Sequence, residues 1–166
     1  ESAASSETAE PEPTVPGNAV VAGSWAVLDA SAVQDEASLQ AAAQQLAQQG
    51  AAYAVVTLKD STGQILYPSQ VPAAAGSIEG ASLDPARIAS VLKDNGLVPV
   101  AKLAAFRDPM AARANRGMAI GYRNQEYLWL DNKASAGGNP WLNPYAAEAV
   151  QYIGDLIDEL HTAGFD

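Results

Sequence analysis

Charged residues follow two apolar segments of this sequence, at positions where a parallel α/β protein binds its ligands. Lys59 and Asp60 end one apolar run, and Arg107 and Asp108 follow another. The groups that contact ligands in parallel α/β folds lie just past the carboxyl ends of the strands. Asp60 is therefore the first candidate for a catalytic carboxylate, because a neighbouring lysine would keep it ionised.

Each of the two expected strand segments, 53–60 and 97–106, has one lysine on an otherwise apolar face. Alternation puts Lys59 on the face of Thr57, and it puts Lys102 on an apolar face of the other strand. A lysine inside a buried strand needs a carboxylate partner or a wet pocket. Both lysines are therefore candidate partners of the catalytic carboxylate. The alternative is that Lys102 lies in solvent on an edge strand.

Two of the candidate aspartates also have ordinary structural interpretations. Asp60 begins the sequence Asp-Ser-Thr-Gly, which is typical of a turn. Asp108 precedes a proline, and this pair is a common helix start, so an N-cap role is favoured over catalysis. Asp29 and Asp131 are the other carboxylates expected near strand ends or on neighbouring loops.

Composition indicates one globular domain with a real core and excludes several classes of function. The chain has 166 residues, of which 48% are hydrophobic. Its net charge of −10, with nine Lys and Arg in all, argues against nucleic-acid binding. There is no cysteine, and His161 is the single histidine, so thiolate zinc sites and multi-histidine metal sites are excluded. We expect no cofactor, no bound metal and no membrane span.

The N-terminal residues 1–18 form a segment of low complexity, rich in Ser, Ala, Glu and Pro. Such a segment buries almost nothing, so we expect a disordered linker that acts as a tether, followed by one domain over 19–166. The sequence begins without a methionine or an apolar signal core. This fits the mature form of an exported protein, and a cloning boundary fits equally well.

Helix signals alternate with the apolar runs, and this order predicts a parallel α/β fold. The first strand is expected from Ala19 to Asp29. Helices are expected over 38–49, from Pro85 after an Asp84 N-cap to a stop at Gly96, over 110–115 and over 145–161. The chain reaches its last residue where the next strand should begin. A (β/α)8 barrel needs about 250 residues, so the sequence would hold less than its first half, and a complete three-stranded fold is the alternative.

An irregular insert over 117–144 contains most of the aromatic residues outside the expected strands and helices. We expect loops and a short hairpin here. Trp129 and Trp141 could stack on sugar rings or could cover an edge of the core, and the sequence slightly favours the covering role.

Three segments of the sequence, 59–69, 102–112 and 141–166, resemble the glycoside hydrolase family DUF4015. The resemblance extends over about residues 20–166 and holds the three motifs in the same order. It implies the first half of a TIM-type barrel that acts on a bacterial or environmental polysaccharide. Members are typically exported or envelope-associated, which implies an extracellular or cell-envelope location for a tethered chain.

The resemblance also implies roles for individual residues at the mouths of the strands. It makes Asp60 the catalytic candidate. The substrate-binding candidates are Lys59, Lys102, Arg107, Asp108 and Trp141. Asp166 would stand at the start of the fourth strand, where its role would be structural.

Two departures from the family pattern bear on activity. Thr57 stands where many members have an acidic residue, and the acidic fourth-strand motif is missing. Most glycoside hydrolases need two carboxyl groups about 5–5.5 Å or roughly 6.5–9.5 Å apart. We therefore expect this chain to be inactive alone and the longer protein to be a hydrolase. Open barrel edges would be covered by the rest of the barrel or by self-association.

A second interpretation is a noncatalytic carbohydrate-binding or envelope-scaffold protein. Thr57, the short chain and the aromatic insert favour it. A third, a flavodoxin-like nucleotide binder, has little support because no Gly-rich phosphate loop follows any strand.

Overall fold

A computed structural model of the chain describes residues 23–28, 30–78 and 83–166. The predicted linker and Asp29 lie outside the described residues. In the part that is described, the parallel α/β class predicted from the sequence is confirmed.

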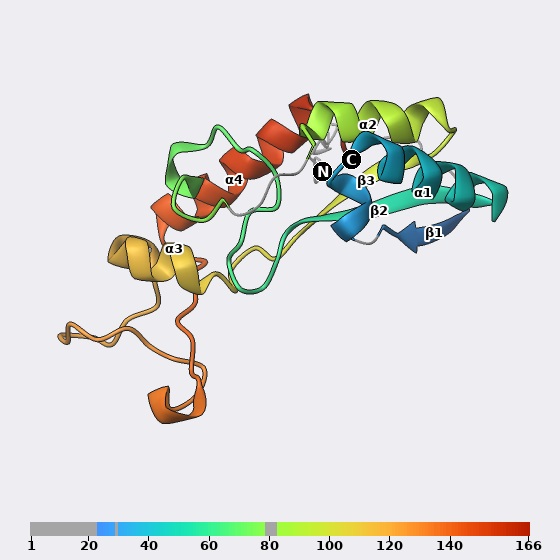
Figure 1. The fold of residues 1–166 in the computed structure, drawn as a ribbon. Helices are drawn as coiled ribbons and strands as arrows, with labels where there is room; N and C mark the ends of the chain where they lie inside the picture. The colour runs from blue at the N-terminus through green and yellow to red at the C-terminus, as the bar shows by residue number, and fades with distance from the viewer. Residues whose placement is uncertain (1–22, 29, 79–82) are drawn as a thin grey trace, which may run out of the picture.

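Within the described residues, three parallel strands form one sheet in the order β1-β2-β3. They are β1 (Ser24–Val27), β2 (Ala51–Lys59) and β3 (Val98–Leu103). Figure 1 shows β2 between the other two, so β1 and β3 are edge strands.

Four α-helices accompany the sheet in the described residues, and three of them begin at an aspartate whose side chain caps the helix. Asp84 accepts a hydrogen bond from the backbone N–H of Ala86, with Pro85 as the first helical residue, as predicted. The helices are α1 (Glu36–Gln48), α2 (Pro85–Asp94), α3 (Pro109–Ala114) and α4 (Ala147–Thr162). Short 3₁₀ turns are η1 (Ala30–Val33), η2 (Pro72–Ala74), η3 (Arg116–Met118) and η4 (Ala134–Ala136).

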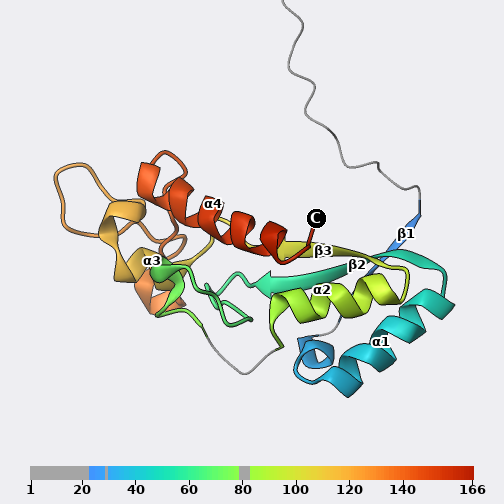
Figure 2. The ribbon, with the colours of Figure 1, turned by 90° about the horizontal axis from the view of Figure 1, so that it is seen from above.

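The helices cover one face of the sheet and leave the other face open. Ala54, Val56 and Leu58 of β2 are buried beneath α1 and α2. Figure 2 shows these helices along one side of the strands, with α1 packed against α2 and α2 against α4. The opposite face of β2, which includes Tyr53 and Val55, is only partly covered. The described core is therefore one-sided.

A β-bulge at the end of β2 changes the face of Lys59. Thr57 pairs with Lys102, and Lys59 pairs with the next residue, Leu103, so two residues of β2 match one step of β3. A bulge of this kind redirects the side chain that follows it. The prediction that Lys59 shares a face with Thr57 is therefore wrong: Leu58 and Lys59 are both buried.

The connection from β3 to α4, residues 104–146, extends away from the sheet, and we call it the arm. Figure 1 shows it in gold and orange, with α3 at its base. The short hairpin expected here is present as antiparallel bridges, Gly121 with Leu128 and Leu130 with Pro140. The arm follows the carboxyl end of β3, which is the ligand-binding side of parallel α/β folds.

The last described residue continues the sheet beyond β3. The N–H of Asp166 donates to the carbonyl of Pro99 (2.9 Å), and the N–H of Ala101 donates to the carbonyl of Asp166 (3.0 Å). This alternation is the hydrogen-bond pattern of a parallel pair. Asp166 therefore lies where a fourth parallel strand would start, as the resemblance implied.

Candidate functional site

Lys59 lies buried at the carboxyl end of the sheet in an ion pair with Asp108. Its Nζ is 3.0 Å from Oδ2 of Asp108, and both side chains are 0% exposed. Nζ also donates a hydrogen bond to the carbonyl of Ala104. The partner of Lys59 is therefore not Asp60, as the sequence suggested, because the bulge turns the lysine into the core.

Asp108 is held by more contacts than the ion pair. Its Oδ1 accepts the N–H of Ala111 (2.8 Å), which confirms the predicted N-cap of α3. The hydroxyl of Tyr152 on α4 donates to Oδ2 (3.3 Å). Burial, followed by the negative charge of Asp108, raises the pKa of Tyr152 well above its ordinary value. Asp108 of the arm is thereby bonded to both β2 and α4.

The carboxylate of Asp60 accepts hydrogen bonds from its own loop. Its Oδ1 accepts the N–H and the hydroxyl of Thr62 (2.8 and 2.7 Å) and the N–H of Gln64 (3.1 Å). This is an Asx turn, and it confirms the structural interpretation of Asp-Ser-Thr-Gly. A catalytic role for Asp60 stays a prediction.

Lys102 is exposed in the edge strand β3. Of the two alternatives left by the sequence, the solvent-exposed edge lysine is the one observed. Lys59 is buried beside Asp108 while Lys102 is in solvent, so the structure does not bring the two lysines to a common carboxylate. The expectation that these lysines and Asp60 form one cluster is wrong for this reason.

The arm holds a second polar cluster, organised by Asp131. Its Oδ1 accepts the N–H of Asn139 (2.7 Å), and its Oδ2 accepts the indole N–H of Trp141 (3.1 Å). The guanidinium of Arg107 lies 6.0 Å above the centre of the Trp141 ring. Arg113 on α3 donates to Oδ1 of Asn139 (3.0 Å). We call Arg107, Arg113, Asp131, Asn139 and Trp141 the arm cluster.

The sequence predicted part of the arm cluster. Arg107 and Trp141 were substrate-binding candidates, and Asp131 was one of the available carboxylates. Arg113 and Asn139 were missed, because 26 residues separate them and no local pattern joins them. The hydrogen bonds from Asn139 and Trp141, and then the charge of Arg107, lower the pKa of Asp131 below its ordinary value.

A third polar cluster was also missed: Glu159 of α4 ties down the loop after β2. Its Oε2 accepts the hydroxyls of Tyr67 (2.8 Å) and Ser69 (2.7 Å), and its Oε1 accepts the N–H of Gln70 (2.6 Å). Burial and then the hydrogen bond to Glu159 raise the pKa of Tyr67 well above its ordinary value. These contacts join residues about 90 positions apart in the sequence, so no local sequence pattern predicts them.

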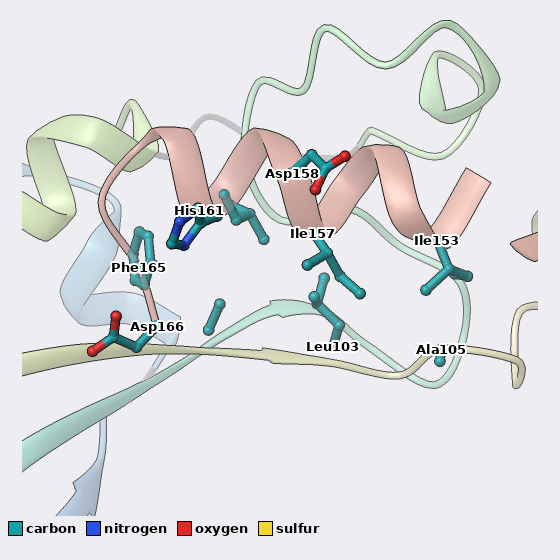
Figure 3. A pocket seen from close by; sticks show the side chains of 10 residues that line it. Leu103, Ala105, Ile153, Ile157, Asp158, His161, Phe165 and Asp166 are labelled. Carbon is teal, nitrogen blue, oxygen red and sulfur yellow. The ribbon is translucent and has the colours of Figure 1, made fainter. Parts of the chain in front are cut away.

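An apolar groove of about 410 Å³ lies between β3 and α4. Figure 3 shows Leu103 and Ala105 facing Ile153 and Ile157 across it, with Asp166 at one end. Its walls are mostly hydrophobic, and it runs along the outer edge of β3. An apolar lining of this kind offers few polar groups to the hydroxyls of a sugar.

A depression of about 460 Å³ contains two further carboxylates, Glu148 and Asp155 of α4. Seven helical residues separate them, a rise of about 10.5 Å along the axis. Glu148 also accepts a hydrogen bond from Asn115 (3.1 Å), so we do not assign a catalytic pair here.

The three aspartates considered as candidates within the described residues have separate structural roles. Asp60 is in a turn, Asp108 is in a buried ion pair and Asp131 organises the arm cluster. The described part of the chain has no group of three His, Asp or Glu residues that could hold a metal ion. No helix in residues 23–28, 30–78 and 83–166 is long and apolar enough to cross a membrane.

Comparisons with known proteins agree with the fold. The family model DUF4015, described as "Putative glycosyl hydrolase domain", matches residues 27–166. No curated protein sequence matches the chain. The chain is similar in structure to a hypothetical protein from Ruminiclostridium thermocellum ATCC 27405, with a TM-score of 0.71 and 23% sequence identity. That match covers 86% of this chain and 72% of the other, and at this identity it supports the fold alone.

Proposed function

Because the chain belongs to the DUF4015 family of glycosyl hydrolase domains, we propose that it is part of a (β/α) barrel that acts on carbohydrate. In this proposal the described residues supply one wall of the barrel and a substrate-binding arm. The proposal includes an extracellular or cell-envelope location, where a polysaccharide substrate would be met.

The one-sided sheet supports the barrel. In a closed (β/α) barrel every helix lies outside, and the inner face of the sheet meets only other strands. The helices here cover one face of β2, while the other face, with Val27 of β1 52% exposed, is open. The apolar groove along β3 and the ladder bonds of Asp166 fit a fourth parallel strand in that groove.

The observation that carries the carbohydrate function, together with the family, is the arm cluster. It stands after β3 on the ligand-binding side of the fold and presents a half-buried Trp141 beside Arg107. An indole held by Asp131 offers a preset ring on which a sugar can stack. The catalytic carboxyl pair, in this proposal, comes from strands beyond β3, because Asp60, Asp108 and Asp131 are already engaged within the described residues.

The test compares glycoside hydrolysis by this chain with hydrolysis by a longer version that includes a fourth and later strands. We expect reducing ends to appear from a polysaccharide panel with the longer protein, and none with the 166-residue chain. The substitution Asp60→Asn in the shorter chain is the control. Turnover by the 166-residue chain that disappears in this variant would assign catalysis to Asp60 and overturn the proposed division of roles.

A noncatalytic carbohydrate-binding protein is the second candidate. The fixed Trp141 favours it, since binding needs a ring and polar groups but no carboxyl pair. Here the longer protein would bind a glycan without releasing product, and Trp141→Ala would weaken that binding. Product release by the longer protein would reject this candidate in favour of the hydrolase.

A further inference from the structure

The charge of the arm has the opposite sign to the charge of the rest of the chain. The whole chain has a net charge of −10. Residues 104–146 nevertheless contain five of the nine Lys and Arg residues, but only three of the 19 Asp and Glu residues. The net charge of the whole chain therefore does not show that the arm is basic.

The accessible charge of the arm is more basic than this count suggests. Asp108 is fully buried and paired with Lys59, so it contributes no surface charge. Asp131 is exposed and, with its lowered pKa, keeps its negative charge, so five positive side chains stand against two negative ones, Glu126 and Asp131, at the surface of the arm. Arg107 and Arg113 are among the exposed positive side chains.

The arm cluster places one guanidinium group over an aromatic ring and connects a second one to the same hairpin. Arg107 lies above Trp141, and Arg113 binds Asn139. Asn139 and Trp141 are both bonded to Asp131, which joins the two arginines through one hairpin. A ligand at this position would meet the guanidinium of Arg107 above the ring, with a second positive charge on Arg113 and the carboxylate of Asp131 in the same cluster.

We propose that the arm cluster binds an anionic glycan, a sugar polymer with carboxylate or sulfate groups. Guanidinium groups bind these oxyanions through paired hydrogen bonds, and the indole supports the sugar ring. The acidic body of the chain repels such a polymer elsewhere, so binding is confined to the arm. This inference rests on the proposed function, because it takes the ligand to be a carbohydrate and specifies its class.

The test measures binding of the 166-residue chain to polygalacturonate oligomers by isothermal titration calorimetry. The fully methyl-esterified oligomers are the neutral counterpart, and dextran sulfate against dextran tests sulfate in place of carboxylate. In whichever of the two pairs the chain binds the charged member, we expect the neutral member to bind at least tenfold more weakly. Binding should also weaken as salt rises.

Matched charge variants locate the site. R107Q/R113Q is expected to weaken binding of the anionic glycan at least tenfold. R87Q/K93Q, which removes two positive charges from α2, is expected to leave it unchanged. If the double variant unfolds, the single variant R107Q replaces it, because the only specific contact of the Arg107 side chain within the described residues is with the Trp141 ring. R107Q should lower the affinity for the anionic glycan at least threefold.

Three results would overturn the proposal. They are equal binding of neutral and anionic glycans, equal loss in both double variants, and equal binding of polyglutamate or single-stranded DNA of similar charge. The first leaves the proposed carbohydrate function intact, with a neutral substrate. If the longer protein also neither binds nor hydrolyses any glycan, the proposed function fails as well.

Discussion

The buried ion pair between Lys59 and Asp108 joins three parts of the chain at the carboxyl end of the sheet. The desolvation cost of two buried charges is large, and it is offset only when both are paired and hydrogen-bonded. Here the carbonyl of Ala104, the N–H of Ala111 and the hydroxyl of Tyr152 provide these bonds. The pair therefore requires β2, the arm and α4 to be in place together.

We predict that Lys59→Met destabilises the chain by about 3–5 kcal/mol, because it leaves a buried carboxylate without its countercharge. The double variant Lys59→Met with Asp108→Asn removes both charges but keeps the side-chain oxygen that caps α3. Its loss should be smaller than the sum of the two single losses. Urea unfolding followed by circular dichroism measures all three. Additive losses would show that the two residues are not coupled.

Two of the six tyrosines, Tyr67 and Tyr152, should resist ionisation in the folded chain. Burial in both cases, with Glu159 or Asp108 nearby, raises the pKa above the ordinary value of about 10. A raised folded pKa gives stability that is present below about pH 10 and lost as pH rises above it. Absorbance at 295 nm should show these two titrating late and together with unfolding. Tyr152→Phe should remove one of the two late absorbance changes, and an unchanged absorbance profile would contradict the prediction.

At the residue scale the sequence located the polar residues better than their partners. The N-cap of Asp108 and the turn of Asp60 were predictable, because an Asp-Pro pair and an Asp-Ser-Thr-Gly run act within a few residues. The partner of Lys59 was not, because a bulge reverses the face that simple alternation assigns.

At the scale of elements, α4 is attached to the loop after β2 chiefly through Glu159. Three donors from Tyr67, Ser69 and Gln70 converge on this one carboxylate. Bonds to a charged acceptor contribute more than neutral ones, so this contact is a main restraint on the loop.

Glu159→Gln is predicted to cost about 1–3 kcal/mol, since an amide keeps only one of the two acceptor oxygens. It should also speed amide hydrogen exchange at Gln70 and its neighbours. Asp158→Asn, the same change at the adjacent exposed residue, is the control and should leave both measurements unchanged. Equal exchange rates in the two variants would contradict the proposed restraint.

The elements themselves were largely predictable, and the arm was not. Helix starts at Asp84 and Asp108 are determined by short-range capping, and β2 by an apolar run of residues. The helix expected over 145–161 begins two residues later, at Ala147. The arm has isolated bridges in place of long strands, and its hydrogen bonds join distant residues, so sequence periodicity does not report them.

At the scale of the whole molecule, the described chain leaves apolar surface open on the sheet and along β3. Trp25 and Val27 of β1 are 70% and 52% exposed, and Ile157 beside the groove is 49% exposed. Contiguous apolar surface next to an unpaired strand edge favours association with another chain. In the proposed barrel the same surface meets further strands.

We therefore predict that the 166-residue chain self-associates through its open sheet face, with a mean mass above 17.1 kDa that rises with concentration. Trp25→Lys should lower this mass toward the monomer, because a charge on the open face opposes contact between two such faces. Tyr145→Lys is the matched control, since Tyr145 is an aromatic residue 94% exposed on the arm. Sedimentation equilibrium distinguishes the two. An equal effect of both substitutions would place the contact elsewhere, and a monomer at every concentration would mean that the open face is stable in water without a partner.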